Sequence, residues 1–207
     1  MDALKLLQTG PVMPVIVIKN IDSAVALAQA LIAGGIRLLE ITLRSDAALD
    51  AIRELRAAVP DAIVGAGTIR TPAQLDAALK AGAQFGVSPG LPPELLTAAA
   101  HAGVPFYPGV ATPTEAMRAA DAGFMVQKLF PAEAVGGRRL LQSLAGPLPD
   151  LFFCPTGGIN LENAPSYLAL PNVVCVGGSW LLPDIAIEEN DWAKVKQLAQ
   201  EAAALRA

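Results

Sequence analysis

Short runs of apolar residues recur along the chain, and a segment long enough for one helix separates each run from the next. Runs of this length, rich in aliphatic residues and bounded by Gly, Pro or polar positions, are typical of buried β-strands. Eight runs fit this pattern, at residues 12–18, 36–43, 62–66, 83–87, 104–107, 124–131, 151–155 and 173–176. They begin about 20 to 25 residues apart, so the pattern predicts a helix after each strand.

The residues between these runs support the same division of the chain into alternating strands and helices. Four predicted helices end in glycine immediately before a strand, at Gly34-Gly35, Gly82, Gly103 and Gly123. Glycine just past a helix is the usual left-handed stop. Helix starts are expected at Ser45, Thr71, Thr112 and Asn160. Thr112 is followed by Pro113 and by Glu115 at the spacing of a capping box.

Eight βα units predict an α/β protein with a (β/α)8 TIM-barrel fold. We expect one domain over residues 1–207, preceded by a short amphipathic N-terminal helix at about residues 2–9. The chain is shorter than a typical barrel of about 250 residues, so insertions must be few. A doubly wound open sheet is the structural alternative, although such sheets usually have fewer strands.

The composition suits strands that are covered on both faces. The chain is 53% hydrophobic and 16% charged, yet no apolar run reaches the roughly 18–20 residues of a membrane span. No signal peptide is recognisable, so we expect a cytoplasmic protein that does not bind membranes. The net charge of −4 argues against nucleic acid as a partner, because nucleic-acid binders usually carry a basic face.

The cysteines and the histidine offer little chemistry. Cys154 and Cys175 lie in apolar, strand-like runs, which predicts two reduced core residues. His101 is the single histidine, which disfavours a metal site built from several histidines. It stands just before Ala102-Gly103, where a helix is expected to end, so we interpret it as a helix C-terminal residue.

A single lysine interrupts the run 124–131. Lys128, inside a predicted buried strand, must reach water, find a partner or lose its charge. A neutral lysine is a nucleophile that forms Schiff bases with ketones. Glu40 lies in the run 36–43, on the same strand face as Thr42 and Arg44. Lys128 and Glu40 could form a structural ion pair. However, buried pairs cost desolvation and often add little stability, so we interpret both residues as catalytic.

Other polar residues follow the strands, where barrels of this type carry their chemistry. Arg44 could be a surface charge, but a guanidinium there could also bind a substrate carboxylate in a fork, with Thr68 as a hydroxyl donor. Gly157-Gly158 and Gly177-Gly178-Ser179 follow the last two predicted strands. For either segment alone, the glycines could simply serve to form a tight turn. Together they indicate a phosphate site made of backbone N–H groups and helix N-termini.

Taken together, these stretches resemble the 2-keto-3-deoxy-6-phosphogluconate (KDPG) aldolase family, class I aldolases of the Entner–Doudoroff pathway. The resemblance spans nearly the whole chain in the family's order. Its motifs are PVIVIKN (14–20), LLEITLRS (38–45), IVGAGTI (63–69), FGVSPGL (85–91), QKLFPAEAVGG (127–137), FCPTGGIN (153–160) and VGGSWL (176–181).

The resemblance implies roles for individual residues. Lys128 matches the Schiff-base lysine and Glu40 the general acid/base. The other matches are Arg44 and Thr68 for the pyruvyl carboxylate, Thr156 for the pyruvate pocket, and Gly157, Gly158 and Ser179 for the phosphate. It further implies a homotrimer that needs no metal or other cofactor. The expected substrate is KDPG, a phosphorylated keto acid cleaved to pyruvate and glyceraldehyde 3-phosphate.

Three alternatives stay open at this point. The same chemistry could act on 4-hydroxy-2-oxoglutarate (KHG) or on the galactonate-derived analogue of KDPG, and the ratio of phosphorylated to unphosphorylated turnover would discriminate them. A phosphate-binding barrel could instead be a decarboxylase or isomerase that forms no imine and resists borohydride. A non-enzymatic sugar-phosphate-binding module would release no pyruvate from KDPG.

Overall fold

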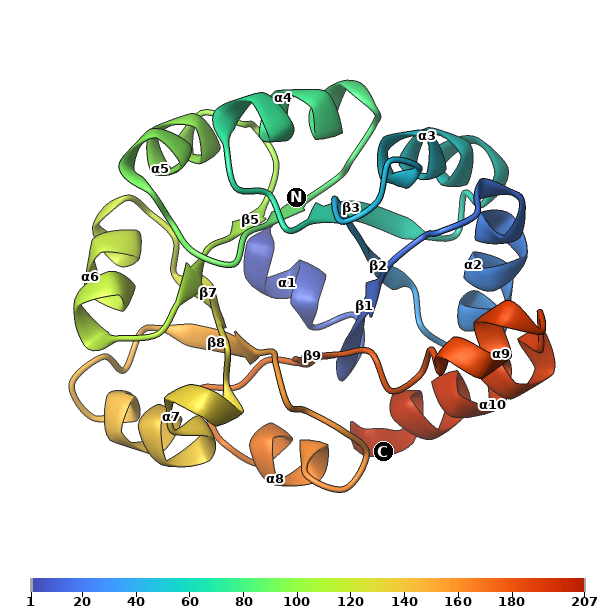
Figure 1. Cartoon of the computed structure of the whole chain (residues 1–207). Coiled ribbons are helices and arrows are strands. Elements are labelled where there is room, and N and C mark those ends of the chain that lie inside the picture. The colour runs from blue at the N-terminus through green and yellow to red at the C-terminus, as the bar shows by residue number, and fades with distance from the viewer. Residues whose placement is uncertain (1, 207) are drawn as a thin grey trace.

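Parallel strands form a closed ring in the computed structural model, which describes residues 2–206 (Figure 1). The strands are β1 (Val12–Ile16), β2 (Leu38–Thr42), β3 (Ile63–Gly67), β4 (Gly86–Val87), β5 (Phe106–Tyr107), β6 (Gly109–Val110), β7 (Val126–Leu129), β8 (Phe152–Pro155) and β9 (Val176–Gly178). They pair in the orders β5-β4-β3-β2-β1-β9 and β6-β7-β8. Bridges from Phe153 to Val173 and from Thr156 to Gly177 join β8 to the β9 segment.

The fifth predicted strand is divided in two. Only Pro108 separates β5 from β6, and proline has no N–H to donate to a ladder. Its carbonyl still accepts from the N–H of Lys128 at 2.8 Å, which keeps the neighbouring strand in place. If β5 and β6 are taken as one strand, the ring has the eight positions that the sequence predicted, and the (β/α)8 barrel is confirmed.

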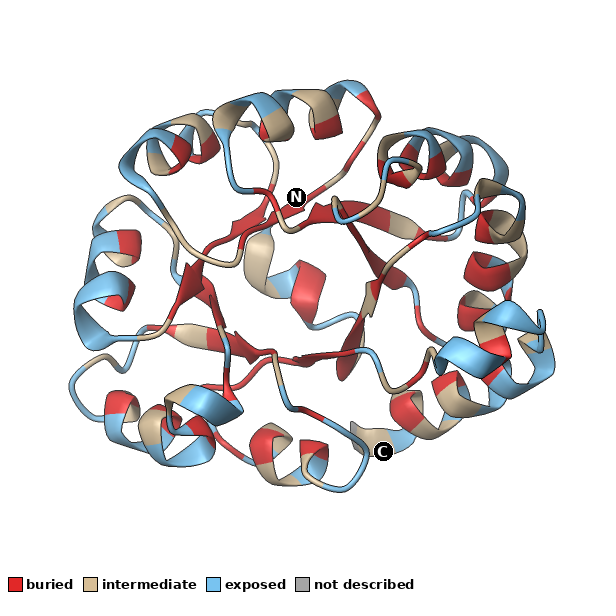
Figure 2. Ribbon diagram, viewed as in Figure 1, coloured by how far each residue is buried: buried red, intermediate tan, exposed pale blue. Residues whose placement is uncertain are grey.

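Helices surround this ring (Figure 1). They are α2 (Ala24–Ala33), α3 (Ala48–Ala58), α4 (Pro72–Lys80), α5 (Pro93–Ala100), α6 (Pro113–Asp121), α7 (Gly137–Ala145), α8 (Ala164–Leu168), α9 (Asp184–Glu188) and α10 (Trp192–Ala203), with short 3-10 turns η1 (Ile21–Ser23), η2 (Glu133–Val135) and η3 (Ala204–Arg206). A further helix, α1 (Ala3–Leu7), lies inside the ring. Figure 2 shows buried strands and helices whose outer faces are exposed, the burial pattern of a two-layer barrel. Among the described residues, no helix is long and apolar enough to cross a membrane.

Most of the predicted helix boundaries are confirmed. Gly35, Gly82, Gly103 and Gly123 all have positive φ, between 71° and 96°. The Thr71 side chain accepts from the N–H of Gln74, and Thr112 and Glu115 form the complete capping box. His101 is the residue that ends α5, as expected.

One predicted helix start was wrong, and a second lies about one turn before its helix. Helix α3 begins only at Ala48, and the hydroxyl of Ser45 donates to the carbonyl of Ile18 on the β1 side, at 2.5 Å. Asn160 accepts from the N–H groups of Glu162 and Asn163 in a turn that precedes α8. Side chains of Ser and Asn bind any nearby backbone group that is unpaired, so their presence did not locate the first helical residue.

The N-terminal helix closes one end of the barrel. In Figure 1, α1 lies within the ring of strands. Leu6 and Leu7 are buried in a cluster with side chains of the barrel interior, and the hydroxyl of Tyr107 donates to the carbonyl of Ala3 at 2.8 Å. Cys154 and Cys175 belong to the same cluster and form no disulfide, which fits two core residues.

Candidate active site

Lys128 and Glu40 meet inside the barrel. Lys128 Nζ lies 3.5 Å from Glu40 Oε1, and the two side chains are 6% and 0% exposed. The pair joins β7 to β2, which lie on different parts of the ring. The sequence predicted this encounter, and the structure places both residues together as expected.

One oxygen of the Glu40 carboxylate is unpaired. Among the described residues, Glu40 Oε2 has no hydrogen-bond partner although it is buried. Buried polar atoms normally have one, and an unpaired carboxylate oxygen beside an amine can accept or deliver a proton. Lys128 Nζ also lies 5.2 Å from the centre of the Phe130 ring.

Glycine at position 67 makes the space that Glu40 occupies. Gly67 is the β3 partner of Thr42 on β2. A Cβ built on Gly67 would lie 2.5 Å from Glu40 Cγ and closer still to Glu40 Oε1. Thr42, one step along the same face, instead serves the fold, because its hydroxyl donates to the carbonyl of Ile16 at 2.8 Å.

Thr156 lies two residues after Cys154, which is the partner of Lys128 on the neighbouring strand. Lys128 pairs with Cys154 across β7 and β8, and Thr156 follows at the end of β8. Thr156 is 4% exposed, and a Cβ on Gly177 would collide with its hydroxyl. The missing side chain at position 177 therefore leaves room for Thr156 at the barrel mouth.

Thr68 and Arg44 stand past the ends of their strands. Thr68 directly follows β3 and has a φ of 59°, a left-handed conformation that is uncommon for a branched residue. Arg44 is exposed, and its guanidinium makes no hydrogen bond or ion pair with residues 2–206. Because β2 ends at Thr42, strand alternation does not fix the direction of Arg44.

Arg44 and Ser179 line one groove of about 550 Å³, beside the end of β1. Lys19 and Asp184 also line it, and they form an ion pair at 3.4 Å. Both are largely exposed, so this pair adds little stability. The groove brings a carboxylate-binding candidate and a phosphate-binding candidate to the same rim of the barrel.

The Gly157-Gly158 turn, here called the glycine turn, has the backbone of an anion cradle. Both residues have positive φ, 100° and 80°. The carbonyl of Gly157 accepts from the N–H of Glu133 at 3.1 Å, and the carbonyl of Gly158 accepts from Asn163 Nδ2 at 2.9 Å. Within residues 2–206, the N–H groups of Gly157 and Gly158 donate to no acceptor. Adjacent unpaired N–H groups can donate hydrogen bonds to an anion.

Helix dipoles contribute less to this site than the sequence indicated. Helix α8 begins at Ala164, well past the glycine turn, and α9 begins at Asp184. Each has only five residues, and one short turn carries little of a macrodipole. The N-termini of these helices therefore add little to any anion site at the glycine turn.

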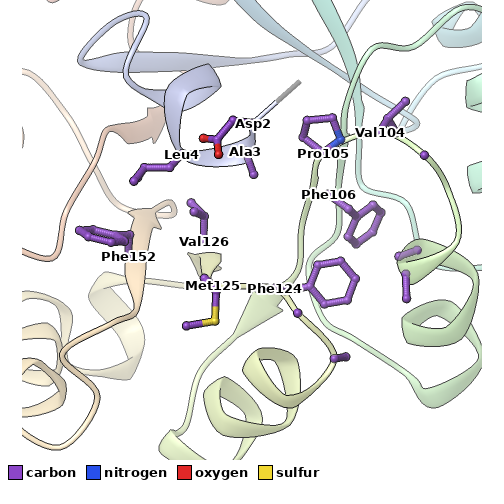
Figure 3. A pocket seen from close by; sticks show the side chains of 15 residues that line it. Asp2, Ala3, Leu4, Val104, Pro105, Phe106, Phe124, Met125, Val126 and Phe152 are labelled. Atoms are coloured by element: carbon purple, nitrogen blue, oxygen red, sulfur yellow. The ribbon is translucent and has the colours of Figure 1, made fainter.

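A second cavity, of about 590 Å³, lies at the opposite end of the strands (Figure 3). Phe106, Phe124, Val126 and Phe152 line it where their strands begin, together with Leu4 of α1. Its lining contains neither Lys128 nor Glu40, and its polar chemistry is limited to Asp2 and backbone groups. We therefore place the chemistry around Lys128 and Glu40 and not in this second cavity.

Residues 2–206 contain no cluster of three or more His, Cys, Asp or Glu side chains placed to hold a metal ion. The polar partner of the Lys128 side chain is the carboxylate of Glu40, an arrangement suited to proton transfer and to an amine nucleophile.

Some residues of the site act by small size or from a distance, and the sequence did not mark these roles. Gly67 leaves space for Glu40, and Gly177, expected only as part of a phosphate turn, leaves space for Thr156. A signal for Gly67 did exist, because it lies opposite Thr42 if β2 and β3 pair in parallel, but the register was needed to see it. Asn163 and Glu133 act on the glycine turn from other loops, and nothing in their local sequence marks them.

Comparison with known proteins agrees with this geometry. The family model for KDPG and KHG aldolases matches residues 4–198. The KHG/KDPG aldolase of Escherichia coli strain K12 is 52% identical over 200 residues, covering 97% of this chain and 94% of that protein.

Two solved structures are similar along the whole chain. The KDPG aldolase of Legionella pneumophila, with pyruvate captured at low pH as a covalent carbinolamine intermediate, has a TM-score of 0.97 at 44% identity and covers 99% of both chains. The enzyme of Zymomonas mobilis ZM4 with 3-phosphoglycerate has a TM-score of 0.95 at 44% identity, covering 99% of this chain and 96% of that chain.

A parallel barrel with a lysine and a carboxylate buried together inside it has the nucleophile and the proton carrier of a Schiff-base enzyme. The chain belongs to the KDPG and KHG aldolase family, and its activity is that of an aldolase.

Proposed function

We propose that this protein is a class I aldolase that cleaves KDPG to pyruvate and glyceraldehyde 3-phosphate through a Schiff base on Lys128. One observation carries the proposal: the only buried lysine among the described residues lies 3.5 Å from a fully buried carboxylate that has an unpaired oxygen. This pair has the two functions that the reaction needs, a nucleophile and a proton carrier.

The reaction begins with attack of the neutral Lys128 amine on the C2 ketone, which gives a carbinolamine. Glu40 delivers a proton to the departing hydroxyl, and loss of water leaves an iminium that draws electrons from C3. Glu40, directly or through a water, then takes the proton of the C4 hydroxyl. The C3–C4 bond breaks, its electron pair enters the iminium, and glyceraldehyde 3-phosphate leaves.

The enamine that remains on Lys128 takes a proton at C3 and is hydrolysed to pyruvate, which returns the lysine to its starting state. In this scheme Arg44 and Thr68 bind the pyruvyl carboxylate and Thr156 packs in the pyruvate pocket. The glycine turn and Ser179 bind the distal phosphate. The covalent pyruvate adduct in the Legionella relative supports the lysine chemistry proposed for this chain.

The unphosphorylated KHG and the galactonate-derived analogue are the nearest competing substrates, since they share the reacting end. Membership in an aldolase family weakens the other two alternatives, a decarboxylase or isomerase without an imine and a non-enzymatic binding module. What favours KDPG over KHG is the pair of unpaired N–H groups on the glycine turn.

We expect kcat/KM to be about a hundredfold higher for KDPG than for KHG, the value of one or two hydrogen bonds to a charged group. Steady-state pyruvate release with each substrate measures the ratio. Gly158→Ala should reduce the ratio, because its methyl would collide with Glu133, whereas Gly10→Ala enters open space and serves as the control. Equal turnover of KDPG and KHG by the wild type would contradict the proposed phosphate site.

The assembly, pathway and compartment stay predictions. From the resemblance we propose a homotrimer that acts in the Entner–Doudoroff pathway in the cytoplasm.

A further inference from the structure

We propose that Asn163, Glu133 and Tyr167 are positioning residues that hold the glycine turn and thereby set the preference for a phosphorylated substrate. These three residues, here called the brace, lie outside the lysine–carboxylate pair. Asn163 and Glu133 contact the turn, and Tyr167 binds Glu133. The inference rests on the proposed function, because it assigns the brace to the phosphate end of that same site.

Asn163, Glu133 and the neighbouring Ala132 donate hydrogen bonds to the carbonyl side of the turn. Thr156 O accepts from the N–H of Ala132 at 2.8 Å and Gly157 O accepts from the N–H of Glu133 at 3.1 Å. Gly158 O accepts from Asn163 Nδ2 at 2.9 Å. With three successive carbonyls held in this way, the peptide planes of the glycines are fixed. Their unpaired N–H groups are then oriented before any anion arrives.

Asn163 is itself held by Asn160 through its side chain and its backbone. Its Oδ1 accepts from the N–H of Asn160 at 2.9 Å, and its backbone N–H donates to Asn160 Oδ1 at 3.0 Å. Asn163 precedes α8 but makes no side-chain capping bond to that helix. Its amide nitrogen is therefore committed to the glycine turn, and loss of this donor should leave α8 intact.

Glu133 packs directly on the turn. A Cβ on Gly158 would lie 2.6 Å from Glu133 Cγ, so the stem of Glu133 occupies the space behind this residue. The hydroxyl of Tyr167, from α8, donates to Glu133 Oε1. A Cβ on Gly137 would collide with this hydroxyl. Glycine at position 137 therefore lets the two side chains meet.

Tyr167 also restrains the negatively charged carboxylate of Glu133. A mobile carboxylate near a phosphate site would repel the ligand, and the hydrogen bond from Tyr167 restrains the carboxylate of Glu133. Burial and this hydrogen bond raise the pKa of Tyr167 above its ordinary value, so the hydroxyl remains a donor at neutral pH.

The test compares Asn163→Ala and Tyr167→Phe, both uncharged changes, on KDPG and KHG. We expect KM for KDPG to rise about tenfold, the usual effect of one lost hydrogen bond in a charged site. KM for KHG and kcat for both substrates should stay within about twofold, since the reacting end is untouched.

Tyr107→Phe is the matched control. Tyr107 is also a buried tyrosine with one hydrogen bond to a fixed acceptor, but it lies at the α1 end of the barrel. The Tyr107→Phe variant should lose about as much stability as Tyr167→Phe and leave the KM values for KDPG and KHG unchanged. If one brace variant fails to fold in a thermal melt, the other decides the question.

The outcomes separate the two proposals. A selective rise in KM for KDPG supports the brace. Unchanged KM values, or equal changes for KDPG and KHG, in a wild type that prefers KDPG would overturn the brace and leave the phosphate site standing. A wild type with no preference for KDPG would contradict the phosphate site and overturn the brace with it.

Discussion

Lys128→Met should lower kcat for KDPG cleavage by about 10⁴-fold or more, the usual loss when a covalent nucleophile is removed. Methionine has a similar length and fills the same apolar surroundings, but it cannot form an imine. The measurement is the rate of pyruvate release at saturating KDPG. The change leaves Glu40 buried without its partner, which is destabilising, so circular dichroism should accompany the assay.

Lys80→Met provides the control for this experiment. Lys80 is an exposed lysine of α4 in an ion pair with Asp76, so its loss removes the same charge away from the barrel interior. It should keep the wild-type rate. If folded Lys128→Met retained more than about a hundredth of that rate, the covalent role of Lys128 would be refuted.

Glu40→Gln should lower kcat by about 10²- to 10³-fold, since general acid–base catalysis contributes typically that much. Glutamine keeps the shape of the side chain but cannot exchange a proton. Steady-state kinetics measure the effect, with Glu94→Gln at an exposed position of α5 as the control.

Gly67→Ala tests the same role without changing an ionisable group. Its methyl would enter the space of the Glu40 carboxylate, so the carboxylate must move away from Lys128. We expect a kcat loss in the same direction as that of Glu40→Gln. Wild-type kcat in both variants would show that Glu40 carries no proton in the rate-limiting step.

The sequence was sufficient for the arrangement of the barrel because its signals are local. Aliphatic runs, glycine stops and the Thr112 capping box each depend on a few neighbouring residues, and the structure contains them where expected. The meeting of Lys128 and Glu40 followed from the barrel itself, because charged side chains from two interior strands have few other partners.

What the sequence did not reveal depends on contacts between distant residues. Glu133 and Tyr167 are 34 positions apart in the sequence, and the space that Gly67 leaves for Glu40 requires the register of β2 against β3. Arg44 illustrates a different limit. Alternation predicts side-chain direction only while the strand continues, and β2 ends two residues before Arg44.

The most direct test of the Schiff base is borohydride trapping. The protein is incubated with pyruvate and sodium borohydride, digested, and searched by peptide mass spectrometry for a reduced adduct. We expect a stable adduct on Lys128 and none in Lys128→Met. A folded wild-type protein with no adduct on any lysine would contradict the Schiff-base mechanism.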